Sequence, residues 1–205
     1  SEIQEKQLTT LDKNIYALEV DGTFDDCQKL VKTAFLDKSL KNTINLSSAN
    51  SINIARLIPQ SFYYVHSFLQ LKNKDIPLIF SVPCGNFGNI TAGLIAKKMG
   101  VPIHKFIAST NLNDVIPNYL LSGNYVPKPS IQTISNAMDV GNPSNIVRIN
   151  QLYKNIESIR NIMDSWSFNE NSTKEMILDT FENYDYLLDP HSSVGLLGIK
   201  KYCKN

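Results

Sequence analysis

The residues that most directly suggest chemistry form one short segment rich in glycine and asparagine: Gly85, Asn86, Phe87, Gly88 and Asn89. An apolar, partly β-branched run at 77–82 precedes the segment and predicts a buried strand, and a helical pattern at 91–99 follows it. A strand that turns through glycines into a helix presents unpaired N–H groups and the positive end of the helix dipole. The segment is therefore a candidate anion site, and phosphate is the anion most often bound in this way.

Glycines at such a position also occur simply to turn the chain, so the spacing alone leaves both interpretations open. The segment lacks the dinucleotide pattern G-x-G-x-x-G and the P-loop pattern G-x-x-x-x-G-K-[ST], because no lysine follows Gly88 until Lys97. The side chains of Asn86 and Asn89 can donate amide hydrogens where the backbone N–H groups point. Cys84 has no His or Lys next to it in sequence and is interpreted as a small buried residue, not as a reactive thiol.

A second candidate site is a group of polar residues near the predicted start of a helix: Asn50, Ser51, Asn53 and Arg56. Hydroxyls and amides at a helix N-terminus, followed about one turn later by a guanidinium, can bind an oxyanion. Taken singly, Asn50 or Ser51 is better explained as a plain helix N-cap and Arg56 as a solvated surface charge, so only their combination indicates an anion site. Two anion sites in one chain suggest a phosphorylated cofactor and a phosphorylated substrate.

The elements that must position these residues alternate between strands and helices. Thr23 is the predicted N-cap of an early helix, with Asp26 three residues later, and Ser172 and Glu175 have capping-box spacing before an apolar run. The pattern indicates an α/β fold with a mostly parallel sheet, and it becomes mostly helical beyond Pro143. Strands are predicted at 15–20, 77–82 and 104–110, and helices at 3–11, 24–35, 54–71 (interrupted by Pro59), 91–99 and 113–123.

Length, charge and cysteine content limit the class of protein. A chain of 205 residues can form one large or two small domains. The 20 Lys and Arg against 19 Asp and Glu, with no basic block longer than a pair, argue against nucleic acid and membrane surfaces as partners. No apolar stretch approaches the roughly 20 residues of a membrane span. Cys27, Cys84 and Cys203 are unclustered, which favours a cytoplasmic location over a disulfide framework or a metal site.

Five motifs, in order along the chain, resemble those of threonine synthases: NSINIARL, SVPCGNFGNITAGLIAKKMG, KFIASTNLNDVIPNYL, ISNAMDVGNPSN and DPHSSVG. The resemblance implies the fold of type II pyridoxal-phosphate enzymes, a three-layer αβα arrangement like that of the tryptophan synthase β subunit, here incomplete. It also implies that residues 1–45 belong to the smaller cofactor-binding lobe and residues 46–205 to the larger one.

The resemblance implies a reaction as well: conversion of O-phospho-L-homoserine and water into L-threonine and phosphate by β,γ-elimination and replacement, with pyridoxal 5'-phosphate as cofactor. The segment 85–89 would hold the cofactor phosphate. Asn50, Ser51 and Arg56, with Asn53 as a weaker candidate, would bind the substrate phosphate, and Arg56 would stabilise charge on it as it departs. A serine or threonine dehydratase and a non-catalytic binding protein for phosphorylated ligands, built on the same scaffold, stay as alternatives.

The sequence also departs from the family pattern. None of its lysines lies in the Phe-Lys-Asp context of the family's Schiff-base lysine, so this chain is expected to contain no catalytic residue and to be inactive alone. The missing initiating methionine and the helical pattern at 195–205 favour an internal piece of a longer protein. His191 and Asp189 are weaker candidates for a place near the cofactor. The sequence predicts no metal site, and monomer and homodimer both stay open.

Overall fold

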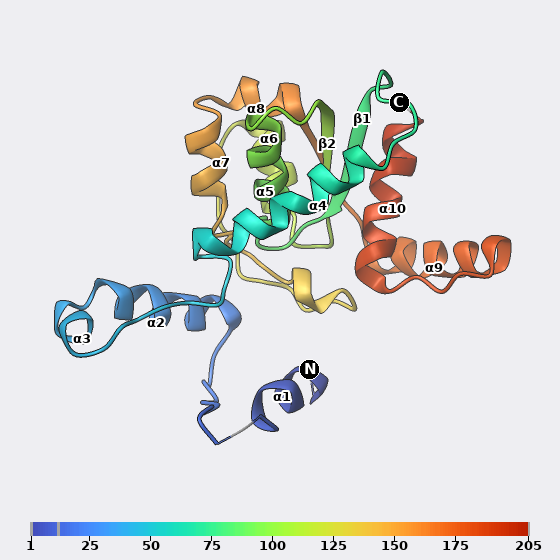
Figure 1. Ribbon diagram of the computed structural model, residues 1–205. Helices are drawn as coiled ribbons and strands as arrows, with labels where there is room; N and C mark the ends of the chain where they lie inside the picture. The colour runs from blue at the N-terminus through green and yellow to red at the C-terminus, as the bar shows by residue number, and fades with distance from the viewer. Residues whose placement is uncertain (1, 12, 205) are drawn as a thin grey trace. The chain divides into compact units, whose positions relative to one another are not determined.

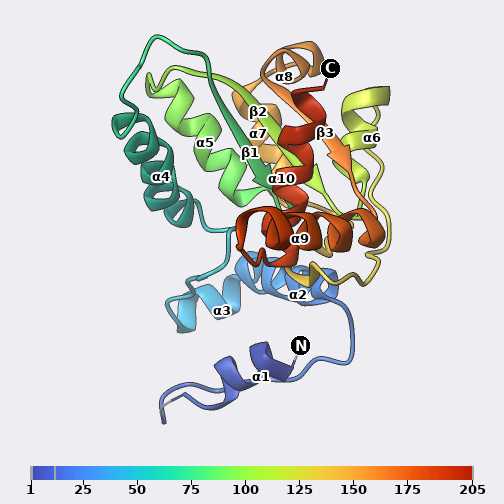
Figure 2. The same ribbon diagram turned by 90° about the vertical axis from the view of Figure 1, so that its right-hand side faces the viewer.

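A parallel three-stranded sheet, in the order β1-β2-β3, forms the centre of the larger part of the chain (Figure 1 and Figure 2). The structure is a computed structural model that describes residues 2–11 and 13–204. The chain divides into two compact units, Ser1–Leu46 and Ser47–Asn205, and the sheet lies in the second. This sheet confirms the predicted parallel arrangement. Its strands are β1 (Leu78–Pro83), β2 (Ile103–Thr110) and β3 (Met163–Ser167).

Helices cover both faces of this sheet, which gives the predicted three layers. Figure 1 shows α5 and α7 on one side of the sheet, and Figure 2 shows α10 lying across β1 and β2 on the other. The helix α4 packs on the outer side of α5. The helices of this unit are α4 (Leu57–Leu69), α5 (Gly88–Lys98), α6 (Val115–Ser122), α7 (Ile146–Leu152), α8 (Ile156–Ile162), α9 (Glu170–Tyr184) and α10 (Pro190–Tyr202).

A single glycine sets how closely α5 approaches its neighbours. A Cβ on Gly93 would lie 2.6 Å from ring atoms of both Phe106 in β2 and Tyr64 in α4. Both rings are buried, and they stack edge to face with centroids 5.8 Å apart. Because no side chain fits between them, α5 lies against β2 and α4 at a fixed distance, and the loop that precedes α5 is fixed with it.

The unit Ser1–Leu46 contains α1 (Glu2–Thr9), α2 (Phe24–Leu36) and α3 (Lys38–Thr43). The predicted cap of α2 is confirmed: Thr23 N donates to Asp26 Oδ2 at 2.8 Å, and the Thr23 hydroxyl accepts from Asp26 N. The predicted strand at 15–20 is wrong. This segment pairs with no other strand in the described part of the unit, and a strand is stabilised by hydrogen bonds to a neighbour.

Three other features differ from the prediction: the start of one helix, an additional strand and the cap of another helix. The pattern at 54–71 is a 3₁₀ turn, η1 (Ile54–Arg56), followed by α4, and Pro59 lies in the first turn of α4, where its missing N–H breaks no hydrogen bond. The mostly helical region beyond Pro143 is interrupted by β3. The capping box at Ser172 is also wrong, because Asn169 caps α9 and accepts from Ser172 N at 2.8 Å.

Candidate functional site

The glycine- and asparagine-rich segment connects β1 to α5 at the carboxyl end of the sheet. Its start is fixed to β2, because Cys84 N donates to Ser109 O at 2.8 Å. Beside the segment lies a cavity of about 210 Å³. One water molecule in the liquid takes up about 30 Å³, so the cavity has room for a larger group. The residues that line it are Ser51, Gln60, Pro83, Cys84, Gly85, Asn86, Phe87, Gly88 and Asn89.

The two glycines are required by close packing and not by positive φ. A Cβ on Gly85 would lie 2.7 Å from Met138 Cα and 3.0 Å from Ala137 O. A Cβ on Gly88 would lie 3.0 Å from Ser51 Cβ. Neither glycine has a positive φ. The segment therefore needs glycine because other parts of the chain approach its backbone.

The residue with left-handed backbone angles is instead Phe87, at φ 59° and ψ 17°. This conformation is uncommon for an aromatic residue and costs about 1–3 kcal/mol. Burial of the ring, which is only 2% exposed, holds it in place. Phe87 is also the N-cap of α5, and no side chain caps this helix. The first backbone N–H groups of α5 are therefore left for a ligand at the positive end of the helix dipole.

The Asn86 side chain fixes the segment to a distant part of the chain. Its Oδ1 accepts hydrogen bonds from Ser144 N at 2.6 Å and Ser144 Oγ at 2.8 Å, and its Nδ2 donates to Ser51 Oγ at 2.8 Å. Asn145 Nδ2 donates to the Asn86 carbonyl at 2.9 Å. Because both the oxygen and the nitrogen of this carboxamide form hydrogen bonds within the protein, the side chain stabilises the conformation of the segment.

Arg148 connects the same cluster to the second predicted group. Its Nη1 donates to Ser51 O at 3.1 Å and to Asn145 Oδ1 at 2.6 Å, and its Nη2 donates to Ile52 O. Sequence reasoning missed Ser144, Asn145 and Arg148. The motif ISNAMDVGNPSN marked the region, but partners more than 50 residues apart in sequence leave no local pattern that assigns them a role.

The structure brings only Ser51 of the second predicted group to the cavity. Asn50 Oδ1 accepts from Ser51 Oγ at 3.1 Å. Asn53 caps η1 by accepting from Ala55 N at 3.0 Å. Arg56 is exposed, and its guanidinium donates to the Ala49 carbonyl. The remaining guanidinium N–H groups have no acceptor among the described residues.

Buried groups next to the segment stay uncharged. The Tyr64 hydroxyl donates to Asn89 Oδ1 at 2.5 Å, and burial, with a smaller contribution from Cys84, raises the pKa of Tyr64. Burial also raises the pKa of the Cys84 thiol, whose Sγ donates to Val82 O at 3.2 Å. These features support the interpretation of Cys84 as an unreactive residue.

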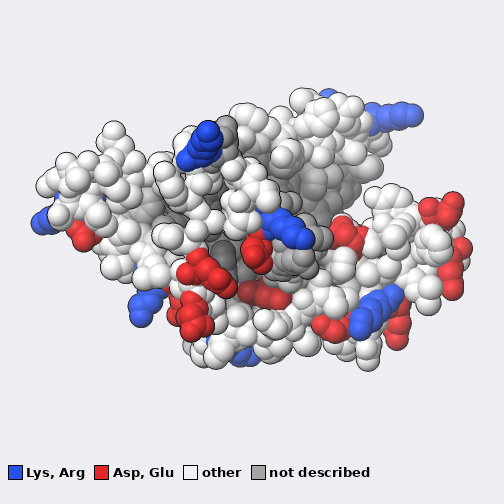
Figure 3. Space-filling view, turned by 90° about the horizontal axis from the view of Figure 1, so that it is seen from below, with Lys and Arg blue, Asp and Glu red and all other residues white. Residues whose placement is uncertain are grey.

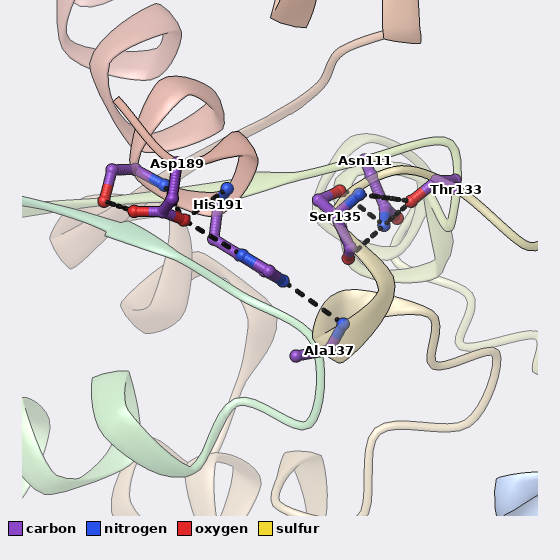
Figure 4. A network of polar contacts seen from close by, with 7 residues as sticks. Asn111, Thr133, Ser135, Ala137, Asp189 and His191 are labelled. Atoms are coloured by element: carbon purple, nitrogen blue, oxygen red, sulfur yellow. Dashed lines mark hydrogen bonds and ion pairs between the residues drawn. The ribbon is translucent and has the colours of Figure 1, made fainter. Parts of the chain in front are cut away.

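His191 contacts the turn that packs on Gly85, Asp189 contacts His191, and neither residue lines the cavity (Figure 4). Asp189 caps α10 by accepting from His191 N at 2.8 Å, and its Oδ1 lies 3.0 Å from His191 Nδ1. Burial acts to raise the pKa of Asp189, but hydrogen bonds from Ser192 and His191 outweigh it and lower the pKa to about 2. Ala137 N donates to His191 Nε2 at 3.2 Å, and Ala137 belongs to the turn η2 (Asn136–Met138) that packs on Gly85.

A second polar cluster holds the same turn from the side of β2, as Figure 4 also shows. Asn111 Nδ2 donates to Thr133 Oγ1 and to Asp139 Oδ1, both at 2.8 Å, and to Ser135 Oγ at 3.1 Å. Asn111 and Ser135 are buried. The turn that packs on Gly85 is therefore held by the side chain of Asn111, which follows β2 directly, and by that of His191 in α10.

Neither a continuous basic patch on the face drawn in Figure 3 nor a metal site is found among the described residues. Figure 3 shows acidic and basic side chains interspersed, without one continuous basic patch on the described part of that face. The described residues contain no group of three or more His, Cys, Asp or Glu placed to hold a metal ion. Among them there is also no helix with the length and apolar character needed to cross a membrane.

Threonine synthases are found both among the similar curated sequences and among the similar solved structures. No family model matches the chain. Threonine synthase from Buchnera aphidicola subsp. Schizaphis graminum is 48% identical over 194 residues, which cover 94% of this chain and 45% of the relative. The crystal structure of threonine synthase from Escherichia coli matches with a TM-score of 0.90 at 40% identity, over 98% of this chain and 47% of that one.

A structure of PLP-bound threonine synthase from Brucella melitensis matches with a TM-score of 0.83 at 34% identity, over 98% of this chain and 49% of that one. The chain thus spans about half the length of the curated relatives and solved structures that it matches.

Proposed function

We propose that this chain, a homologue of threonine synthases over nearly its whole length, provides the cofactor-phosphate site of such an enzyme. The full-length protein would convert O-phospho-L-homoserine and water into L-threonine and phosphate. The observation that carries the proposal is the uncapped N-terminus of α5 beside a cavity of about 210 Å³. Free backbone N–H groups at the positive end of a helix favour a dianionic phosphate.

The residues present fit pyridoxal phosphate. Gly85 and Gly88 have no side chains that would shield the backbone of the segment, and a side chain at either position would lie very close to neighbouring residues. No acidic residue lines the cavity, so no side-chain charge there repels a phosphate. Pyridoxal phosphate, when bound, supplies an electron sink for carbanions formed next to its ring. This chain would bind the phosphate of the cofactor and orient the ring. The relative with a PLP-bound structure supports this assignment.

We place the lysine that links the cofactor covalently outside this chain. No lysine lines the cavity beside the segment 85–89.

We also propose that residues 1–45 and 46–205 contribute to the smaller and larger lobes of the enzyme, respectively. The three cysteines are all free, which supports a cytoplasmic location.

We further propose that Asn50, Ser51, Asn53 and Arg56 bind the substrate phosphate. The exposed guanidinium of Arg56 keeps most of its N–H donors available, and a planar guanidinium can bind a phosphate through two hydrogen bonds. Dehydratases act on substrates that carry no phosphate. A strong dependence on Arg56 would therefore separate a threonine synthase from a dehydratase on the same scaffold.

The test uses the full-length protein with Arg56→Ala. We expect kcat/KM for O-phospho-L-homoserine to fall by at least about tenfold, because a hydrogen bond to a charged group contributes about 1.5–3 kcal/mol. Retention of pyridoxal phosphate should stay within about twofold of wild type. Lys72→Ala, which removes an exposed cation beyond α4, is the matched control and should change neither quantity. Absence of threonine formation by the wild-type protein, or equal loss of both quantities in Arg56→Ala, would contradict the proposal.

A further inference from the structure

We propose that Gln60 is an additional ligand-binding residue of the cavity, and that its side-chain amide donates a hydrogen bond to the phosphate group held by the segment 85–89. This inference rests on the proposed function. Nothing in the sequence patterns assigned a role to Gln60, which lies between Pro59 and the aromatic part of α4. We base the assignment on the position of Gln60 beside the cavity and on the absence of a hydrogen bond from its side chain to any described residue.

The first part of α4 holds Gln60 at the cavity. Leu57 and Ser61 are buried, and the Tyr64 hydroxyl donates to Asn89 Oδ1 at the end of the segment. Residues four apart lie on the same face of a helix, so Gln60 lies one turn before Tyr64 on the face that meets the segment. Gln60 is half-buried and lines the cavity together with the segment and Ser51.

Each of the other polar side chains that line the cavity makes at least one hydrogen bond within the protein, and the exposed Asn89 does so through its Oδ1 only. Ser51 Oγ donates to Asn50 Oδ1 and accepts from Asn86 Nδ2. The Cys84 thiol donates to Val82 O, and Asn89 Oδ1 accepts from Tyr64. Gln60 alone among these side chains makes no hydrogen bond to a described residue. A half-buried carboxamide that lacks partners gains most from a ligand with strong acceptor oxygens.

The charge of the cavity indicates what Gln60 would bind. Neither acidic nor basic side chains line it, and the positive end of the α5 dipole points into it. The negative charge of a phosphate in this cavity would be stabilised mainly by hydrogen bonds from the backbone N–H groups of the segment. The amide of Gln60 would donate one more hydrogen bond to the phosphate and would add no charge to the cavity. Replacement of the amide by a carboxylate would place a negative charge next to the phosphate and repel it.

The experiment measures dissociation constants of the full-length protein for pyridoxal phosphate and for pyridoxal, which lacks the phosphate. Gln60→Glu should weaken pyridoxal phosphate binding by at least about tenfold near neutral pH. Gln60→Ala should weaken it by about tenfold, the effect of one lost hydrogen bond to a charged group. Binding of pyridoxal should stay within about twofold of wild type in both variants. This difference between the two ligands would not arise from a purely structural role of Gln60.

Gln70→Glu is the matched control, because it makes the same chemical change at the exposed C-terminal end of the same helix. It should leave both dissociation constants unchanged. If Gln60→Glu fails to fold, Gln60→Ala still tests the proposal through the two ligands. Wild-type protein that binds no pyridoxal phosphate would overturn the proposed function. Wild-type protein that binds it, with Gln60 variants that bind it equally well or lose pyridoxal to the same extent, would overturn only the role of Gln60.

Discussion

Gly85 tolerates no side chain, because backbone atoms of Ala137 and Met138 lie against it. In Gly85→Ala the new methyl group would lie 2.7 Å from Met138 Cα, so either the segment 85–89 or the turn η2 must move. The flexible end of a side chain could rotate away from the new methyl group, but these backbone atoms cannot move without shifting the turn. We expect the full-length variant to bind pyridoxal phosphate at least about tenfold more weakly, since a displaced segment misdirects its N–H groups. Fluorescence titration with the cofactor measures this change.

The control for Gly85→Ala is Gly100→Ala. Gly100 has φ +112°, and a Cβ added to it would have no other atoms within 4 Å, so alanine there is strained but collides with nothing. It should lower the thermal midpoint while leaving cofactor affinity unchanged. Cofactor affinity that falls equally in both variants would show that general destabilisation, and not the geometry of the segment, explains the effect at Gly85.

Single residues of the candidate site were only partly predictable from sequence. The segment 85–89 stood out because glycines between a strand and a helix form a local pattern. The reason for the glycines could not be predicted, because the chain that packs on Gly85 comes from about 50 residues later. The left-handed conformation of Phe87 was also missed, since burial of its ring by distant residues is what imposes it.

Among the elements, α10 depends on one carboxylate at its start. Asp189 accepts hydrogen bonds from the backbone N–H groups of His191 and Ser192. Hydrogen bonding lowers the pKa of Asp189 from 3.8 to about 2 despite partial burial, so the carboxylate is more stable in the folded chain than in the unfolded one. Its contribution to folding stability is therefore complete above pH of about 4 and is lost as the pH falls toward about 2.

Asp189→Asn tests this prediction, because asparagine keeps a neutral N-cap and removes the titrating group. Urea unfolding at a series of pH values gives the free energy of unfolding for both proteins. We expect wild type to exceed the variant in stability above pH of about 4, and the difference to narrow as the pH decreases further. Asp189→Ala, which removes the cap entirely, should cost about 1 kcal/mol near neutral pH. A difference between wild type and Asp189→Asn that is independent of pH would contradict the prediction.

Elements with strong local signals were predicted, and elements that depend on distant partners were not. β1 is a short apolar run, β2 has the apolar residues Phe106, Ile107 and Ala108 at its centre, and the Thr23 cap precedes a regular helical pattern. β3 was missed because its sequence, MDSWS, lacks an apolar run, and it exists through pairing with β2, where Phe106 lies opposite Met163. The segment 15–20 has the opposite character, with an apolar pattern but no strand beside it in the described part of its unit.

At the scale of the whole molecule, the two units differ in how much apolar surface they bury. In the unit Ser47–Asn205 a continuous core joins the sheet to α4, α5 and α7. The described part of the unit Ser1–Leu46 contains three helices of 8, 13 and 6 residues, and several large apolar side chains there are mostly exposed, including Leu18 at 89% and Leu36 at 79%. Short helices that bury few apolar side chains are marginally stable in water, so we expect the first unit to unfold more easily than the second.

The single tryptophan allows this expectation to be tested, because Trp166 lies in β3 and reports only on the second unit. In a guanidinium titration of this 205-residue chain, far-UV circular dichroism should decrease before Trp166 fluorescence changes, since the helices of both units contribute to the former signal. In a chain reduced to residues 47–205 the two signals should change together. If the two signals of the 205-residue chain instead change at the same guanidinium concentration, the two units unfold together and the prediction is wrong.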